Sequence, residues 1–203
     1  MNTTAHQERL ERIAALVPTG SRVLDLGCGN GELLAMLRDQ RDCTGYGVEL
    51  DDAKVLECIH RGVNVIQRNL EQGLSLFHDN HFDVVLQLDT LQHLRNTELM
   101  LRETARVGRM GIVSFPNFAH WPHRLSVLKG RMPVSKSLPY QWYDTPNIRV
   151  ATFADFRQLA EQNGLRVLES FGLQDGQEIR RWPNLRASTA VFKFACQPSA
   201  ERP

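Results

Sequence analysis

The stretch "VLDLGCGNGEL", residues 23–33, is a short apolar run that passes into a turn with glycine at positions 27, 29 and 31. Residues 31–40 then carry leucines at helical spacing, so this part of the chain predicts a strand, a turn and a helix. Glycines so close together let a backbone approach a nucleotide-like ligand, because they have no side chain. Several ligand classes are bound by such turns, so the exact spacing has to discriminate among them.

The glycine spacing excludes two common nucleotide-binding motifs. A dinucleotide-binding turn has the pattern G-x-G-x-x-G, which requires glycine at position 32, where this chain has Glu32. A Walker phosphate loop requires Gly-Lys-Ser/Thr at its end, which does not follow here. The pattern is instead G-x-G-x-G, with Asp25 two residues before the first glycine.

Strand-like and helix-like segments alternate along the rest of the chain. The earlier strands are nearly continuous apolar runs, which predicts an α/β protein whose parallel sheet has helices on both faces. The last strand alternates apolar and polar residues, so we expect a hairpin at one edge of the sheet. The predicted strands are residues 22–27, 44–50, 63–67, 82–88, 110–116, 165–173 and 188–196, and the predicted helices are residues 4–16, 31–40, 51–62, 96–107 and 153–164.

The composition predicts one globular domain, residues 1–203, with an elaboration. Hydrophobic residues make up 42% and charged residues 23%, and the formal net charge of +1 gives no reason to expect nucleic acid or a membrane surface as a partner. The first residues mix charges with apolar side chains, so we expect neither signal peptide nor anchor, and a cytoplasmic location. The four cysteines lack C-x-x-C spacing, and we expect no metal.

The residues "LDLGCGNG", followed by an acid at the end of the second strand, resemble motif I of the class I S-adenosylmethionine-dependent methyltransferases. The physical chemistry agrees, because this cofactor has a zwitterionic amino-acid tail that needs close backbone approach and nearby hydrogen-bonding groups. The resemblance implies a Rossmann-like sheet of seven mostly parallel strands, with the final, reversed strand at the edge. The cofactor would lie beyond the carboxyl ends of the first, second and fourth strands, where open α/β sheets generally bind ligands.

The resemblance assigns S-adenosylmethionine, or its product S-adenosylhomocysteine, to residues at the ends of the first four strands. The Glu49 carboxylate can accept hydrogen bonds from both ribose hydroxyls, although NAD sites use the same contact. Asn69 has two interpretations, an amide at the adenine edge or a simple turn residue, and both stay open. The expected cofactor-binding residues are Asp25, Gly27, Cys28, Gly29, Asn30, Gly31, Glu49, Leu50, Asn69, Leu70, Gln87 and Leu88.

No catalytic residue can be assigned from the sequence. Methyl transfer is an in-line displacement for which a protein supplies alignment and, where needed, a base. His93 is a candidate base because imidazole titrates near neutrality, and a structural histidine at a helix start is the alternative. Cys28 lies inside the glycine turn, so we interpret it as a small turn residue and not as a nucleophile.

Residues 117–150, after the fifth strand, interrupt the alternation and predict an insertion or cap. They hold two of the three tryptophans and two of the three tyrosines, and five basic residues against one acid give a local charge of +4. A nucleic-acid surface, a cap over a small acid, a docking face for a protein and a loop packed on the core all remain open. The candidate substrate or partner residues are Asn117, Trp121, Arg124, Tyr140, Trp142 and Tyr143.

The insertion, together with "TFADFRQL" and "PNLRAS", closely resembles the MetW family of bacterial methionine biosynthesis proteins. This resemblance covers nearly the whole chain and implies a role beside the homoserine O-acyltransferase MetX. From the balanced charge we expect no nucleic-acid or membrane partner. Two hypotheses follow from the resemblance. The chain is a methyltransferase whose insertion caps an unidentified small substrate, or it is a sensor in which S-adenosylmethionine changes the binding of the acyltransferase by linkage.

Overall fold

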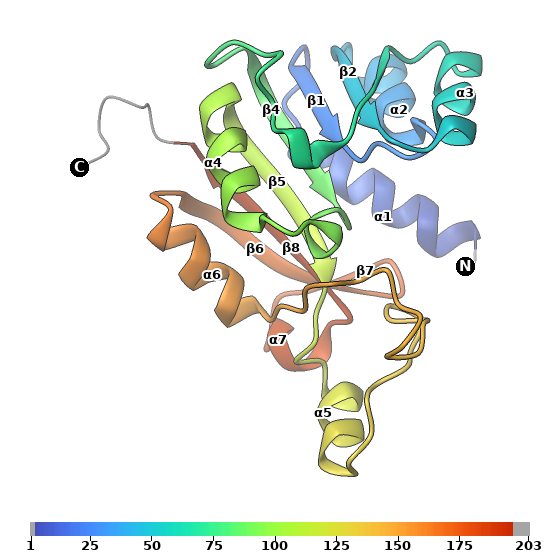
Figure 1. Cartoon of the computed structure of the whole chain (residues 1–203), viewed down its shortest axis with the longest axis vertical. Helices are drawn as coiled ribbons and strands as arrows, with labels where there is room; N and C mark the ends of the chain where they lie inside the picture. The colour runs from blue at the N-terminus through green and yellow to red at the C-terminus, as the bar shows by residue number, and fades with distance from the viewer. Residues whose placement is uncertain (1–2, 197–203) are drawn as a thin grey trace.

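The sheet contains eight strands in the order β3-β2-β1-β4-β5-β8-β6-β7, in a computed structural model that describes residues 3–196 (Figure 1). The first five strands in this order pair in parallel, whereas β8 is antiparallel to both β5 and β6. The predicted α/β, Rossmann-like class is confirmed. The strands are β1 (Arg22–Leu26), β2 (Thr44–Glu49), β3 (Val65–Gln67), β4 (Phe82–Leu88), β5 (Gly108–Pro116), β6 (Arg166–Gln174), β7 (Gln177–Ile179) and β8 (Thr189–Ala195).

The final strand lies inside the sheet, which corrects the expectation of an edge position. β8 pairs with β5 on one side and with β6 on the other. Its alternating pattern has another cause, because the Lys193 ammonium group donates a hydrogen bond to the Leu16 carbonyl over 2.9 Å. The strand can therefore carry this partly buried lysine, because its ammonium group keeps a hydrogen bond.

The sheet edge is β7, an eighth strand that the seven-strand expectation does not include. It pairs with β6 in an antiparallel hairpin. The hairpin turns at Asp175 and Gly176, whose φ angles are +49° and +85°. Asp-Gly is the residue pair that such two-residue turns favour, so the signal was present in the sequence.

Helices cover both faces of the sheet and divide its core in two. Side chains of α1, α2 and α3 pack on one face, and side chains of α4 and α6 pack on the other. None of the helices in residues 3–196 is long and apolar enough to cross a membrane. The helices are α1 (Thr3–Leu16), α2 (Glu32–Arg41), α3 (Asp52–His60), η1 (Leu70–Gln72), η2 (Leu91–His93), α4 (Thr97–Val107), α5 (Trp121–Leu128), α6 (Phe153–Gln162) and α7 (Pro183–Arg186).

Alternation along β1 decides which way its one acid points. Leu24 and Leu26 belong to the core under α4 and α6, whereas Val23 belongs to the core under α1 and α2. Successive side chains in a strand point to opposite faces, so Asp25 shares the α1 face with Val23. Burying each of these apolar side chains contributes roughly 1.5–3 kcal/mol, but a buried carboxyl at the same depth is unfavourable unless it finds a partner.

The insertion leaves the sheet after β5 and returns to it before α6. Figure 1 shows α5 projecting from the body of the molecule, with the segment behind it running back toward the sheet. The returning segment is held by the Gln92 carbonyl, which accepts hydrogen bonds from the amides of Ile148 (2.9 Å) and Arg149 (3.0 Å). A bridge between Asn117 and Ala151 closes the base of the insertion.

Candidate functional site

The three glycines of the turn after β1 have different roles. All three have positive φ, +77° for Gly27, +57° for Gly29 and +75° for Gly31. A Cβ on Gly27 would lie 2.6 Å from the Thr90 hydroxyl oxygen, and one on Gly31 would lie 2.9 Å from the Cys58 sulfur. A Cβ on Gly29 would have no atom within 4 Å. The outer glycines therefore allow close packing, and the middle one faces open space where a ligand can approach the backbone.

The carboxylate of Glu49, at the end of β2, is fixed beside this turn. Its Oε2 accepts a hydrogen bond from the Gly29 amide over 2.9 Å. Its Oε1 accepts from the amides of Leu50 (2.8 Å) and Asp51 (3.0 Å). Each carboxylate oxygen has more than one acceptor site, so Glu49 can still receive hydrogen bonds from a diol. Leu50 is exposed at the same end of the sheet.

Asp25 lies beneath the turn with an unsatisfied oxygen. Its side chain is only 3% exposed, and its Oδ1 has no hydrogen-bond partner among the described residues. Burial, with a smaller effect of the Glu49 charge, raises the pKa of Asp25 to about 7. Orphaned buried polar atoms are rare and unfavourable, so the site lacks a donor here. An ammonium group would supply both the donor and the compensating charge.

A cavity of about 200 Å³, here called the turn cavity, lies between the glycine turn and α1. His6 and Arg9 of α1 form one wall, and Leu88 and Asp89 at the end of β4 form another. His6 reaches across to Glu32, with Nε2 and Oε2 separated by 3.1 Å. The cavity brings together these predicted residues: Asp25, Gly27, Cys28, Gly29, Asn30 and Leu88.

The ion pair between Arg9 and Asp89 is a part of the site that sequence reasoning missed. Arg9 Nη2 donates to Asp89 Oδ2 over 2.6 Å and to the Ser114 hydroxyl over 3.0 Å. Asp89 has a φ of +51°, a left-handed conformation that is uncommon outside glycine. This position directly after β4 was the available sequence signal, because ligands bind at the carboxyl ends of strands in such sheets.

Arg9 and Asp89 also line a second cavity of about 550 Å³, here called the hairpin cavity. It extends from α1 toward the turn between β6 and β7, and Lys136 and Ser137 of the insertion contribute to its wall. The two cavities share only Arg9 and Asp89 among their lining residues. The ion pair is therefore the boundary between the turn cavity and a space that reaches the insertion.

Three of the residues predicted to bind the cofactor, Asn69, Leu70 and Cys28, make contacts within the protein. The Asn69 side chain accepts a hydrogen bond from the Glu71 amide over 2.9 Å and caps η1, as expected of a turn residue. Leu70 is partly buried against the core. The Cys28 sulfur lies 3.8 Å from that of Cys58, and burial raises the pKa of the Cys28 thiol, so this thiol stays protonated.

Gln87 and Asn117 are both fully buried and face away from open space. The Gln87 amide donates to the Thr104 hydroxyl of α4 over 2.6 Å, on the sheet face opposite Leu88. The Asn117 amide donates to the carbonyls of Asn184 (2.9 Å) and Ala187 (2.8 Å). Neither side chain lines the turn cavity, and Gln87 Oε1 has no hydrogen-bond partner among the described residues.

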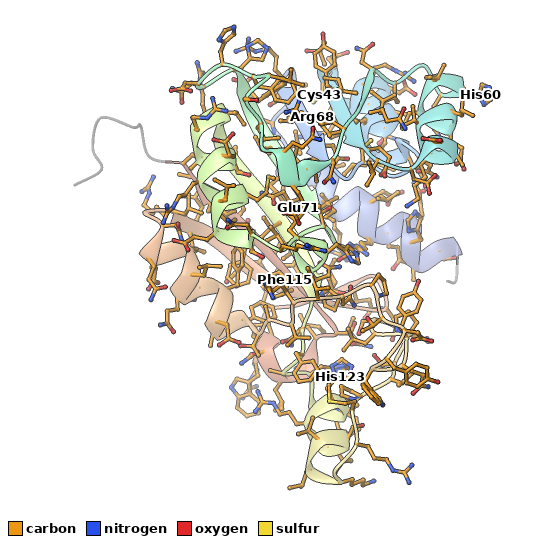
Figure 2. The ribbon with its side chains drawn as sticks, in the orientation of Figure 1. Cys43, His60, Arg68, Glu71, Phe115 and His123 are labelled. Atoms are coloured by element: carbon orange, nitrogen blue, oxygen red, sulfur yellow. The ribbon has the colours of Figure 1, made fainter. Side chains whose placement is uncertain are left out.

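The insertion is organised around a buried histidine. His123, labelled in Figure 2 where α5 joins the body, is 1% exposed. Its Nδ1 lies 3.1 Å from the Asn117 carbonyl oxygen, and its Nε2 lies 2.8 Å from the Ser135 hydroxyl. Arg124 is similarly engaged, since its Nε donates to the Ala119 carbonyl over 2.6 Å. These bonds tie α5 to the segment that returns toward the sheet.

The tryptophans and tyrosines of the insertion lie on its surface. Trp142 and Tyr143 are each 71% exposed and meet edge to face with ring centroids 5.6 Å apart. Trp121 and Tyr140 are about half exposed. His93 is exposed, with Nδ1 3.1 Å from the Pro146 carbonyl oxygen, so it contacts the insertion and does not line the turn cavity.

The fold and this site define a protein of the class I S-adenosylmethionine-dependent methyltransferase fold. The magnesium protoporphyrin IX methyltransferase of Synechocystis PCC 6803, solved with bound S-adenosylhomocysteine, is one similar structure. The similarity covers 96% of this chain and 84% of that chain, with a TM-score of 0.68 and 19% sequence identity. The predicted fold class is confirmed.

Sequence comparison identifies the particular family. A model of the methionine biosynthesis protein MetW matches residues 7–194, and the chain belongs to this family. The bifunctional methionine biosynthesis protein MetXA/MetW of Rhodopirellula baltica is 41% identical over 198 residues, which are 91% of this chain. This chain spans only 32% of that longer protein. The ubiquinone biosynthesis O-methyltransferase of Pseudomonas fluorescens is 30% identical over 162 residues, which cover 76% of this chain and 68% of that enzyme.

Proposed function

We propose that the chain binds S-adenosylmethionine or S-adenosylhomocysteine and acts in methionine biosynthesis, in the cytoplasm, together with the homoserine O-acyltransferase MetX. The observation that carries the proposal is the meeting of three groups in one place. The orphaned Asp25 carboxyl, the open backbone at Gly29 and the fixed Glu49 carboxylate lie at the ends of adjacent strands. An ammonium group, the amino-acid tail that carries it and a ribose diol would fit these three features in turn.

The residues fit the cofactor part by part. Asp25 would bind the ammonium group, the open space at Gly29 would let the amino-acid tail lie against the turn, and Glu49, whose Oε2 already accepts from the Gly29 amide, would bind the ribose hydroxyls. Leu50 would pack on the adenine, and the Asn69 side-chain NH₂ group can still donate while its oxygen caps η1. When bound, S-adenosylmethionine supplies an electrophilic methyl group, and the task of these side chains is to bind and orient it.

The insertion supports the partner half of the proposal. Exposed aromatic side chains such as Trp142 and Tyr143 are enriched in protein interfaces and rarely gather on a surface without a binding role. The Rhodopirellula baltica relative carries MetXA and MetW in its name as one bifunctional protein. Joining two proteins in one chain raises their effective concentration for each other, as expected of partners that work together.

A chain of contacts connects the turn cavity to this surface. Arg9 and Asp89 separate the turn cavity from the hairpin cavity, which Lys136 and Ser137 of the insertion help to line. Next to them, the Ser135 hydroxyl lies 2.8 Å from Nε2 of His123 on α5. Cofactor binding that shifts the Arg9–Asp89 ion pair would therefore change the insertion, and by linkage the partner would change cofactor affinity equally.

Co-purification with MetX from the same organism tests this proposal. We expect the two proteins to form a complex, acyltransferase activity to change when this chain is added, and that change to depend on S-adenosylmethionine. A pair that neither associates nor alters acyltransferase activity at any cofactor concentration would contradict the partner role. Calorimetry with S-adenosylhomocysteine and this chain alone tests the binding half separately.

The hairpin cavity favours a second candidate, an active methyltransferase on an unidentified small molecule. The hairpin cavity has a volume of about 550 Å³ and adjoins the turn cavity, where a methyl acceptor would have to bind. His93 is the candidate base from the sequence, but it lines neither the hairpin cavity nor the turn cavity and contacts the Pro146 carbonyl, so it would have to move to act. Transfer of a labelled methyl group into a metabolite extract, with loss of transfer in Gly29→Ala and His93→Ala, would support this alternative.

A further inference from the structure

A third cavity, here called the α4–α6 cavity, lies apart from the proposed cofactor site. Its volume is about 410 Å³, and it shares no lining residue with the turn cavity. Small-molecule sites are usually apolar clefts of about 300–1,000 Å³ with a few polar groups. Phe115, labelled in Figure 2 on β5, lies in its wall. The other main apolar residues around it are Leu91, Phe118, Leu138, Phe156 and Leu159.

Two polar side chains face this cavity without partners. Gln92 is 7% exposed, and its Oε1 has no hydrogen-bond partner among the residues that the structure describes. The Thr97 hydroxyl, in the first turn of α4, is also buried there without a partner. The Gln92 backbone carbonyl is held by the amides of Ile148 and Arg149, which fixes the main chain at this wall of the cavity. Each unpaired group costs about 1–3 kcal/mol, which a ligand with matching groups would recover.

The charges around the cavity favour an anion. Arg95 and Arg149 line it, and Arg149 Nη2 donates to the Arg95 carbonyl over 2.6 Å, which holds its guanidinium at the cavity wall. In the described part of the chain neither arginine forms an ion pair with a carboxylate. The first turn of α4 opens here too, and helix N-termini attract negative charge.

The two acids at the cavity are already engaged. Glu98 forms an ion pair with Arg102, one turn along α4. Asp155 closes the capping box of α6, where it accepts hydrogen bonds from the Thr152 amide (3.1 Å) and hydroxyl (2.8 Å). With Glu98 paired to Arg102, the two arginines Arg95 and Arg149 against the ionised Asp155 leave one net positive charge at the cavity, which suits a single negative group at its polar side.

We propose that the α4–α6 cavity binds a small molecule with an apolar body, one carboxylate and one hydrogen-bond donor. The carboxylate would meet Arg95, Arg149 and the Thr97 hydroxyl at the start of α4. The apolar body would pack among the phenylalanines, and the donor would satisfy Gln92. Several of these walls belong to the end of the insertion, so an occupied cavity would also hold the insertion against α4 and α6.

A fluorescent probe of this chemistry, 6-hydroxy-2-naphthoate, tests the proposal on the full chain. The neutral control is 6-hydroxy-2-naphthamide, which has the same ring and hydroxyl group. We expect saturable one-to-one binding of the naphthoate, with the amide about tenfold weaker or more because it lacks the charge-assisted hydrogen bonds. Arg149→Gln should weaken the naphthoate about tenfold and leave the amide nearly unchanged. Lys129→Gln, an insertion lysine outside the cavity, is the matched control.

Filling the cavity provides the steric test. Leu159→Trp places a large ring inside it and should abolish naphthoate binding. If thermal melting shows that this variant does not fold, Val150→Trp replaces it, because Val150 lines the cavity but is largely exposed. Saturating S-adenosylhomocysteine should leave probe binding saturable, although linkage through the insertion can change its affinity. Absence of saturable binding, wild-type binding in a folded filled variant, or strictly competitive displacement by S-adenosylhomocysteine would each overturn the proposal, whether or not the chain binds its cofactor.

Discussion

The Glu49 carboxylate of β2 accepts a hydrogen bond from the Gly29 amide, over 2.9 Å, in the turn that follows β1. The same carboxylate accepts from the amides of Leu50 and Asp51. The acid and the glycine turn are thereby positioned relative to each other by the protein itself. A ligand that needs both therefore meets a largely preorganised site, which lowers the entropic cost of binding.

Replacing Glu49 by glutamine should weaken S-adenosylhomocysteine binding by about tenfold or more, because hydrogen bonds to a charged acceptor contribute roughly 1.5–3 kcal/mol. Calorimetry on the purified variant measures this directly. Glu57→Gln makes the same chemical change at an exposed position on α3 and should bind like the wild type. If Glu49→Gln and Glu57→Gln bind S-adenosylhomocysteine equally well, Glu49 does not contact the ligand.

Adding a methyl group at Gly29 should abolish binding while leaving the fold intact. No atom lies within 4 Å of the new Cβ, so the protein pays only for the left-handed backbone, roughly 1–2 kcal/mol, whereas the approach of a ligand is blocked. Gly130→Ala is the matched control, since Gly130 has a φ of +73° and equally open surroundings in the insertion. Both variants should have a slightly lower melting temperature than the wild type. Only Gly29→Ala should lose S-adenosylhomocysteine binding in calorimetry. A Gly29→Ala protein with normal affinity contradicts the proposed ligand approach.

Asp25 should make the protein less stable as pH rises. Its pKa is raised from 3.8 to about 7 by burial and by Glu49, so between these values the native state keeps a proton that the unfolded chain has lost. The free energy of unfolding should therefore fall as pH increases from about 4 to about 7, by at most roughly 4 kcal/mol from this group. Urea unfolding at pH 4.5 and pH 7.5 measures the change. Asp25→Asn should reduce this slope, and an unchanged slope would show that the carboxyl is not the cause.

The same carboxyl should couple cofactor binding to proton release. An ammonium group binds the ionised form of Asp25 best, so the affinity for S-adenosylhomocysteine should rise between pH 5.5 and pH 8. Calorimetry in two buffers with different ionisation enthalpies counts the protons released. In Asp25→Asn the release should disappear and the affinity should fall. If Asp25→Asn still releases a proton on binding, the proton comes from another group.

Removing the Trp142 side chain should weaken association with MetX without affecting the fold. Trp142 is 71% exposed, so Trp142→Ala should change stability by no more than about 0.5 kcal/mol. Buried aromatic side chains in interfaces often contribute about 2 kcal/mol or more, which predicts a loss of about thirtyfold in affinity. Trp182→Ala, at a tryptophan that is 66% exposed outside the insertion, is the control. If Trp142→Ala and Trp182→Ala bind MetX with identical affinity in a pull-down titration, Trp142 is not part of the docking face.

Local patterns in the chain were sufficient to predict the glycine turn and most of the sheet. Positive φ at Gly27, Gly29 and Gly31 is a local backbone requirement, and apolar periodicity is a local property as well. The same reasoning put Glu49 at the end of β2, where it meets Gly29. Resemblance in the insertion and in the segments after it pointed to the MetW family before any contact was known.

Tertiary packing decided what local patterns do not encode. Gln87 faces α4 while Leu88 faces the turn cavity, because one residue along a strand reverses the direction of a side chain. β8 carries Lys193 inside the sheet only because the end of α1 brings the Leu16 carbonyl within reach.

The sequence by itself determined the backbone of the turn, the alternation of strands and helices, and the family. Only the tertiary structure joined Arg9 to Asp89, left Asp25 Oδ1 without a hydrogen-bond partner among residues 3–196, placed Gln92 beside an apolar cavity and exposed Trp142. The physical reason is the distance along the chain over which each kind of interaction acts. Backbone conformation depends on neighbours within a few residues, whereas burial, charge pairing and cavities depend on which distant segments pack together.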